Sequence, residues 1–369
     1  MIIQSLKLES FRNYESCDIE FSPGINILYG DNAQGKTNIL EAIYLSATTK
    51  SHRGSKDKDV ILFSKEESHI RSVWNKEGMP YQIDMHLRKN KSKGIAVNSR
   101  VIKKSSQLLG ICNVVFFSPE DLSIIKNGPV ERRRFIDMEL CQIDPSYLHN
   151  LSQYNKIVNQ RNSLLKNMAF SSDPSMKEEM KNVLDVWNHQ LITYGSKIIE
   201  RRIKFNHNLN SIIKQIHFDL SGGKEEIEVV YEPNTTVDDY ENNMMLSHER
   251  DLKYKTTGVG PHKDDLIFQV NGIDIRKYGS QGQQRTAALS LKLSEIEMIR
   301  QVKNHYPVLL LDDVLSELDT GRQNDLLSRI GNIQTIITCT GLDEFVRQRV
   351  KMDRIYRVSK GKTEQINNL

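Results

Sequence analysis

A glycine-rich segment near the start of the chain has the residue types that bind phosphate. It fits the pattern GxxxxGK[ST] and reads Gly30-Asp31-Asn32-Ala33-Gln34-Gly35-Lys36-Thr37. Glycines allow the backbone N–H groups to point at phosphate oxygens, and a following helix adds the positive end of its dipole. Lys36 would neutralise the β- and γ-phosphates, and Thr37 would offer its hydroxyl to Mg²⁺. The segment therefore predicts a site for a nucleoside triphosphate, ATP above all, with Mg²⁺.

Two carboxylates follow an apolar run much later in the chain. The run Val308-Leu309-Leu310-Leu311 is typical of a buried strand in a parallel sheet, and Asp312 and Asp313 come directly after it. Beside the glycine-rich loop, Asp312 can hold Mg²⁺ through water, and Asp313 can act as the base that orients the attacking water. Lys36 and Asp313 are thus the predicted catalytic residues, and Thr37 and Asp312 the predicted metal ligands.

A second anion site is predicted where a helix over residues 280–301 begins. The segment reads Ser280-Gln281-Gly282-Gln283-Gln284, and a serine hydroxyl with free backbone N–H groups attracts anions. Because the glycine-rich loop already forms a complete phosphate cradle, we expect Ser280, Gly282 and Gln283 to complete the γ-phosphate pocket of a second subunit. An ordinary serine-capped helix is the alternative. Asp319, in the segment 316–319, is expected in a loop at the same interface.

The composition excludes several classes of protein. With 369 residues, of which 38% are hydrophobic and 27% charged, the chain can form two domains, or one domain with a large insertion. No apolar run approaches the roughly 20 residues of a membrane span, and the first residues do not have the pattern of a signal peptide. The four cysteines form no CxxC pair, which argues against disulfides and a cysteine zinc site. We therefore expect a cytoplasmic protein without membrane contact.

Basic and acidic residues are segregated, although the net charge is only +4. Residues 50–104 hold 14 basic and 6 acidic side chains, whereas residues 224–251 hold 2 basic and 9 acidic ones. This segregation suits a surface that faces nucleic acid, and a solvated surface is the alternative. Arg132-Arg133-Arg134 fits either a DNA contact or a helix face paired with nearby acids. The best candidates for sequence-independent phosphate contacts are Lys56, Lys58, Lys89, Lys91 and Lys93.

The elements around these motifs predict an α/β fold with a helical insertion. Strand patterns occupy both ends of the chain, and the middle section has helical periodicity over 130–140, 147–167 and 175–217. We predict a nucleotide-binding lobe formed by residues 1–118 and 256–369. A helical lobe is predicted over residues 119–255, with Ser280–Gln284 at the junction of the two lobes.

The combined motifs resemble those of the ABC-type ATPase head shared by structural-maintenance-of-chromosomes (SMC) and Rad-fifty-like proteins. Other stretches are similar to the RecF family of bacterial recombination mediators over nearly the whole chain. These stretches are Lys50-Ser51-His52-Arg53, Phe117-Ser118-Pro119-Glu120-Asp121-Leu122, Glu131-Arg132-Arg133-Arg134-Phe135-Ile136-Asp137, Gln160-Arg161-Asn162 and Gly260-Pro261-His262-Lys263-Asp264-Asp265. The turn Phe11-Arg12-Asn13-Tyr14 is similar to one in the SMC and Rad-fifty-like group.

The resemblance implies a mixed or parallel sheet with flanking helices. It also implies an ATP-dependent DNA-binding protein of recombinational repair and replication, linked to DNA damage and the SOS response. Such a protein dimerises on ATP, clamps DNA at single-strand gaps next to duplex DNA, and helps to load the recombinase. A RecR-like mediator protein is the implied partner. His52 and Arg53 are placed either near the nucleotide base or at the surface.

The sequence departs from transporter-type ABC ATPases in three places. Asp313 replaces the usual glutamate, so the base is held farther from its water, and since a positioned base contributes roughly 10²–10⁴-fold, slow hydrolysis is expected. Thr338 or Cys339 occupies the place of the switch histidine, and Glu120 is the nearest candidate for the Q-loop glutamine. The resemblance thus implies a weak DNA-dependent ATPase that acts as a switch rather than a metabolic enzyme.

Three other functions fit less well. An SMC or Rad-fifty-type structural chromosome ATPase head needs hundreds of coiled-coil residues, whereas the helical middle section spans only 119–255. A transporter ATPase needs a Q-loop glutamine and a switch histidine. An ATPase-linked nuclease needs an acidic metal cluster beyond Asp312 and Asp313.

Overall fold

The chain folds into two compact units in the computed structural model, which describes residues 1–170, 173–342 and 351–366. The first unit comprises Met1–Asp121 and Glu295–Leu369, and the second comprises Leu122–Ser294. This division differs from the predicted one for residues 256–294, which we expected in the nucleotide-binding lobe. They belong to the second unit, because β10 (Asp265–Val270) pairs antiparallel with β9 (Ile227–Glu232). Sheet hydrogen bonds therefore join this segment to the helical part of the chain.

A six-stranded sheet of the first unit carries the predicted chemistry at one edge. Its order is β15-β14-β3-β13-β12-β8, and all neighbours are parallel except β14 and β15. The predicted strands are confirmed, as are the flanking helix α1 (Lys36–Thr48) and the C-terminal hairpin. Because carboxyl ends of parallel strands meet at one edge, the glycine-rich loop after β3 and the acids after β12 lie at the same edge. The strands are β3 (Ile25–Tyr29), β8 (Val114–Phe117), β12 (Val308–Asp312), β13 (Thr335–Cys339), β14 (Arg354–Ser359) and β15 (Lys362–Ile366).

A second, antiparallel sheet completes the first unit, with the order β2-β1-β4-β5-β6-β7. Its strands alternate between buried and exposed residues, and the buried face shares one hydrophobic core with α1. β4 was not predicted from the sequence, because most of its residues are polar. The strands are β1 (Ile2–Phe11), β2 (Tyr14–Glu20), β4 (Glu67–Lys76), β5 (Met79–Arg88), β6 (Lys91–Val97) and β7 (Arg100–Val101), and α10 (Thr320–Ile330) follows β12.

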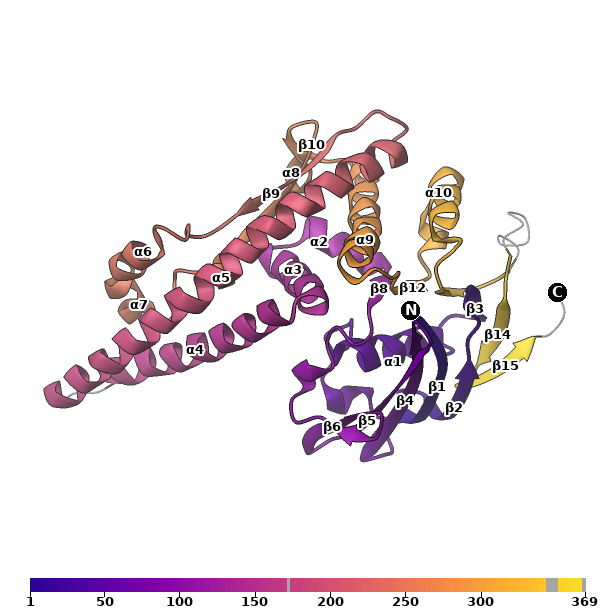
Figure 1. Cartoon of the computed structure of the whole chain (residues 1–369), viewed down its shortest axis with the longest axis horizontal. Coiled ribbons are helices and arrows are strands. Elements are labelled where there is room, and N and C mark those ends of the chain that lie inside the picture. Colours follow the sequence, from indigo (N-terminus) through magenta and orange to yellow (C-terminus); the bar gives the residue numbers. More distant parts are fainter. Residues whose placement is uncertain (171–172, 343–350, 367–369) are drawn as a thin grey trace. The chain divides into compact units, whose positions relative to one another are not determined.

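Two long helices dominate the second unit and lie side by side (Figure 1). The three helices predicted in the middle section are confirmed, and each is longer than predicted. A three-stranded sheet, β11-β10-β9, packs with them. The helices are α2 (Leu122–Lys126), α3 (Pro129–Ile143), α4 (Pro145–Phe170), α5 (Pro174–Leu220), α6 (Tyr240–Leu246), α7 (His248–Tyr254), α8 (Ile275–Tyr278) and α9 (Gln281–Lys303), of which α9 continues into the first unit, and β11 is Ile273–Asp274.

Buried ion pairs hold the helices of the second unit to its sheet. The Arg202 side chain is only 2% exposed, and its guanidinium lies 2.8 Å from the carboxylate of Asp264 and 2.7 Å from that of Asp137. Its remaining N–H groups donate to the Tyr147 hydroxyl and the Pro261 carbonyl. Breaking such a buried pair leaves an uncompensated charge, so α5 and the Gly260–Asp265 segment are strongly coupled.

None of the helices in the described ranges is long and apolar enough to span a membrane. The four cysteines, all at described positions, are free thiols, as expected.

His262, two residues before Asp264, takes part in a chain of hydrogen bonds that its neutral form can complete. Its Nε2 lies 2.9 Å from the Thr257 carbonyl, which can only accept, so Nε2 carries the proton. Nδ1 then accepts from the Tyr154 hydroxyl at 2.7 Å, and Tyr154 is 3.2 Å from the Tyr240 hydroxyl. Burial lowers the pKa of His262 to about 4.

This lowered pKa predicts a loss of stability in mild acid. Below about pH 6.5 the unfolded chain protonates His262, whereas the folded chain does so only below about pH 4. The contribution of His262 to the free energy of unfolding is therefore complete above pH 6.5. It falls by roughly 3 kcal/mol as the pH drops to about 4, and it is constant below that. Urea unfolding of wild type and His262→Gln at several pH values measures this: the stability advantage of wild type should shrink between pH 7 and 4. The exposed His207→Gln should follow wild type, and a parallel pH dependence for His262→Gln would contradict the assignment.

Candidate functional site

The glycine-rich loop has a backbone that only glycine allows at two positions. Gly30 has φ +151° and Gly35 has φ +116°, in the region that L side chains rarely adopt. A Cβ on Gly30 would lie 2.3 Å from the Val358 carbonyl oxygen, and one on Gly35 would lie 2.6 Å from Asn13 Nδ2. The loop therefore requires both glycines to reach the helix α1.

Side chains from distant segments hold this loop in shape. The Tyr14 hydroxyl donates to the Gly35 carbonyl at 3.0 Å, and Asn13 Nδ2 donates to the Gln34 carbonyl at 2.9 Å. From the C-terminal hairpin, the backbone N–H of Lys360 donates to Gln34 Oε1 at 2.7 Å. The Phe11–Tyr14 turn and the last hairpin thus preorganise the loop, which reduces the ordering cost of a ligand.

Lys36 places its ammonium group within the loop. Nζ donates to the carbonyls of Gly30 at 2.6 Å and Asp31 at 2.8 Å. Burial lowers the pKa of Lys36, while the nearby carboxylates of Asp313 and Asp312 counteract that effect. The predicted cation of the site is therefore enclosed by its own loop and lies close to the predicted acids.

Asp312 joins the loop to the two central strands. One of its oxygens, Oδ1, accepts from the Thr37 hydroxyl at 2.7 Å and from the Thr338 hydroxyl at 2.8 Å. Thr338 is the direct neighbour of Asp312 in the β12–β13 pairing. Burial raises the pKa of Asp312, although both hydroxyl hydrogen bonds lower it. The structure thus brings together Thr37 and Asp312, 275 residues apart in sequence.

These oxygens fit the Mg²⁺ site that was predicted. Mg²⁺ prefers oxygen ligands at about 2.0–2.1 Å in an octahedral arrangement and usually keeps several of its waters. The Thr37 and Asp312 oxygens are 2.7 Å apart and lie where the loop meets α1. Small adjustments suffice for the Thr37 hydroxyl to bind the cation and for Asp312 to bind it through water.

Asp313 has a left-handed backbone, with φ +54°. Its N–H donates to the Thr338 hydroxyl at 3.0 Å, so Thr338 contacts both predicted acids. Aspartate tolerates this backbone conformation better than most residues do. The chain turns at Asp313, directly after β12 ends at Asp312. Thr338, one of the two residues at the place of the switch histidine, holds Asp312 and Asp313 in place.

A buried carboxylate on α1, that of Glu41, was not predicted to have a role from the sequence. Arg12 makes two hydrogen bonds to the buried Glu41 carboxylate, at 2.8 and 2.7 Å, and Ser51 donates to the same carboxylate. Burial alone would raise the pKa of Glu41, but the hydrogen bonds from Arg12 and Ser51 lower it. The signal was present as the arginine in the Phe11–Tyr14 turn, but its acidic partner is identifiable only in the fold.

His52 and Arg53, in the segment after α1, have different surroundings. The His52 ring stacks on Phe116, with ring centroids 4.0 Å apart, and meets Tyr44 edge to face. Arg53 is exposed, and its charge lowers the pKa of Asp312 against the larger effect of burial. His52 is thus packed within the first unit, whereas Arg53 is available near the acidic edge.

The predicted second anion site lies at the start of α9. The Ser280 hydroxyl accepts from the Gln283 N–H at 3.2 Å, and Gln283 Oε1 accepts from the Ser280 N–H at 3.0 Å. This reciprocal pair is a capping box, as in the alternative of an ordinary capped helix. Ser280 and Gly282 are nevertheless exposed. Asp319 lies just before α10, where it caps that helix by accepting from the Arg322 N–H and pairs with the Arg322 side chain.

The basic candidates divide into paired and exposed side chains. Lys89 pairs with Glu66, and Lys93 pairs with Asp57, so acids outside the hairpin tip neutralise part of it. Arg132 is buried and pairs with Asp265 through two hydrogen bonds, which places it in the packing of the second unit. The candidates with exposed side chains are Lys56, Lys58 and Lys91.

The fold and the site define the chain as a P-loop ATPase head of the ABC type with an inserted helical region. A family model described as the RecF/RecN/SMC N-terminal domain matches residues 2–365. The chain is 59% identical over 365 residues to the DNA replication and repair protein RecF of Lachnoclostridium phytofermentans, covering 99% of this chain and 100% of that one. It is 60% identical over 361 residues to the RecF protein of Lachnospira eligens, covering 98% of each. The chain therefore belongs to the RecF family.

Solved structures agree with this assignment. A structure of the recombination mediator protein RecF with ATP, described within the RecFOR pathway, matches with a TM-score of 0.91 and 35% identity over 99% of this chain and 97% of that one. The head of an Smc protein bound to the C-winged helix domain of ScpA matches with a TM-score of 0.57 and 17% identity over 99% of this chain and 97% of that one. The second match shows a shared fold.

The position of Thr338 predicts a specific cost of removing its hydroxyl. In Thr338→Val, the N–H of Asp313 loses its acceptor, and Asp312 loses one of its two hydroxyl donors. Because unsatisfied buried polar groups cost about 1–3 kcal/mol, we expect the free energy of unfolding to fall by that amount. Chemical denaturation measures it. Thr338→Ser keeps the hydroxyl and should retain most of the stability, so an equal loss in both variants would argue against the hydrogen bonds.

Proposed function

We propose that this protein is an ATP-dependent DNA-binding protein of recombinational repair and replication. The observation that carries the proposal is the pair of Thr37 and Asp312 oxygens, 2.7 Å apart behind a preorganised glycine-rich loop. Relatives that are 59–60% identical over nearly their whole length are named DNA replication and repair proteins, and a relative that is 35% identical was solved with ATP.

The loop residues 30–37 would bind the triphosphate of ATP through their backbone N–H groups. Lys36 would exchange its contacts with the carbonyls of Gly30 and Asp31 for phosphate oxygens, which are better partners for a charged donor. Thr37 and Asp312 would hold Mg²⁺, which supplies neutralisation of the phosphate charge when bound. Asp313 would orient the attacking water, with its backbone fixed by Thr338.

Two ATP-bound chains would form a closed dimer. Ser280 and Gly282 are exposed at the start of α9, where backbone N–H groups and the helix dipole favour an anion. In the dimer they would contact the γ-phosphate bound by the loop of the other chain. A ligand shifts a conformational equilibrium only through its differential affinity for the two states, and this contact supplies that difference.

The closed dimer would clamp DNA against its basic surface, at a single-strand gap next to duplex DNA. The exposed lysines at 56, 58 and 91 would contact phosphates without reading sequence, and such contacts weaken as salt rises. A RecR-like mediator protein would dock on this state and help to load the recombinase. Slow hydrolysis through Asp313 would reopen the clamp, which makes the protein a weak ATPase with a switching role.

The dimer can be tested with one surface substitution. Wild type with Mg²⁺ and a non-hydrolysable ATP analogue should sediment as a dimer, and with ADP as a monomer. Ser280→Arg places a bulky side chain at an exposed position, so it should abolish the dimer while ATP affinity stays within about twofold of wild type. Arg276→Ala, an exposed residue of the neighbouring helix α8, serves as the matched control and should dimerise. A wild-type monomer with the analogue would reject the clamp, and parallel loss of ATP binding in Ser280→Arg would reject the role in the second subunit.

The role of Asp313 can be separated from nucleotide binding. Asp313→Asn keeps the size of the side chain and removes its basicity, so turnover should fall roughly 10²–10⁴-fold. The ATP-dependent dimer should persist, as measured by sedimentation beside a steady-state phosphate-release assay. Near-normal turnover would place the base elsewhere, and a lost dimer would give Asp313 a structural role.

A further inference from the structure

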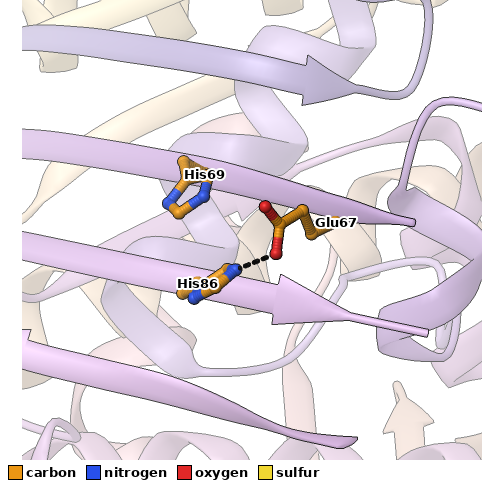
Figure 2. Close-up of side chains that lie close together, drawn as sticks. All are labelled: Glu67, His69 and His86. Carbon is orange, nitrogen blue, oxygen red and sulfur yellow. Dashed lines mark hydrogen bonds and ion pairs between the residues drawn. The ribbon is translucent and has the colours of Figure 1, made fainter. Parts of the chain in front are cut away.

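Three potential metal ligands meet on the antiparallel sheet of the first unit. Glu67 and His69 lie two residues apart on β4 and therefore share one face, and the strand register pairs His69 with His86 of β5. The ligand atoms of Glu67, His69 and His86 all lie within 4.8 Å of one another. Figure 2 shows the three side chains converging from the two neighbouring strands.

The contacts within this cluster are close. The Glu67 Oε2 and His86 Nε2 atoms are 2.8 Å apart, and the rings of His69 and His86 stack with centroids 4.1 Å apart and an interplanar angle of 20°. Ligands of a tetrahedral Zn²⁺ at about 2.0–2.1 Å lie roughly 3.3 Å apart. Rotations of exposed side chains can reach this spacing, because the two histidines are already cross-strand neighbours and the backbone need not move.

The surroundings leave room for a fourth ligand. His86 lies opposite Gly94 of β6, which has no side chain, and Ala96 of the same strand has only a methyl group. Together with both histidines these residues line a hollow of about 340 Å³ that opens to solvent. The cluster lies on the exposed face of the sheet, whereas the face with Ile70 and Met85 belongs to the buried core that contains α1. A ligand here would therefore not compete with one in the glycine-rich loop.

The donor atoms select the kind of metal. Two imidazole nitrogens and one carboxylate oxygen suit Zn²⁺ and other late divalent transition metals, whereas Mg²⁺ and Ca²⁺ prefer oxygen ligands alone. Without a metal, the contact of Glu67 with His86 is an exposed pair of the kind that contributes little to stability. The strand register places His69 beside this pair, and the open hollow next to both histidines leaves space for a ligand.

We propose that Glu67, His69 and His86 bind one Zn²⁺ ion per chain, which joins β4 to β5 and has a fourth coordination position open to solvent. Because the ion would bind only the folded register, it would stabilise the first unit. This site is independent of the proposed ATP function.

The test uses zinc alone, without nucleotide. Full-length protein freed of metal with a chelator is titrated with Zn²⁺ against a chromophoric zinc indicator, and Co²⁺ provides the visible absorption of a tetrahedral nitrogen–oxygen site. We expect one equivalent to bind and the melting temperature to rise with zinc. His69→Ala and His86→Ala should each weaken zinc binding at least about tenfold, and Glu67→Gln should weaken it as well.

Two controls make the result decisive. His207→Ala removes an exposed histidine of α5 outside the cluster and should bind zinc like wild type. Asp312→Asn removes a carboxylate from the nucleotide edge and should retain the equivalent lost in His86→Ala. Circular dichroism of the metal-free variants checks folding. The proposal is overturned if wild type binds no equivalent of zinc, if His69→Ala and His86→Ala bind it undiminished while folded, or if Asp312→Asn abolishes the binding.

Discussion

The carboxylate of Asp312 connects the glycine-rich loop to the central strands of the first unit, and the candidate site depends on this connection. Hydroxyls from α1 and from β13 donate to the same oxygen, at 2.7 and 2.8 Å, so three segments of the chain converge on one buried charge. Burial raises the pKa of Asp312, which means that the carboxylate depends on those hydroxyls in the structure described. A cation between Thr37 and Asp312 would relieve that cost. The contacts that hold Asp312 thus prepare the edge for a charged ligand.

The glycine-rich loop shows how a short motif depends on remote parts of the chain. Its shape is fixed by Asn13 and Tyr14 from the first hairpin and by Lys360 from the last one. Both segments must fold before the loop has its final form. Hydrogen bonds of this kind are individually modest, but together they hold Gly35 in a backbone conformation that the loop would otherwise adopt only part of the time.

Polar groups also organise the second unit, with a different outcome. Arg202 is buried and pairs with the buried Asp264 and the half-buried Asp137, and Arg132 pairs with Asp265. Several residues that look functional in sequence, including the Gly260–Asp265 segment and the triple arginine, therefore have structural partners. Arg132 and Arg133 both contact the Gly260–Asp265 segment, whereas Arg134 is exposed.

The sequence alone determined the phosphate loop, the acidic strand, the helical insertion and the family resemblance, because each is encoded by local spacing or by periodicity. Only the tertiary structure decided which distant side chains meet. Thr338 forms hydrogen bonds with Asp312 and Asp313, Arg12 with Glu41, and the rings of His69 and His86 stack. It also assigned residues 256–294 to the second unit and paired Lys89 and Lys93 with acids outside their hairpin. The physical reason is that strand register and long-range pairing depend on the packing of the whole sheet, and a single sequence carries no direct record of which residues face one another.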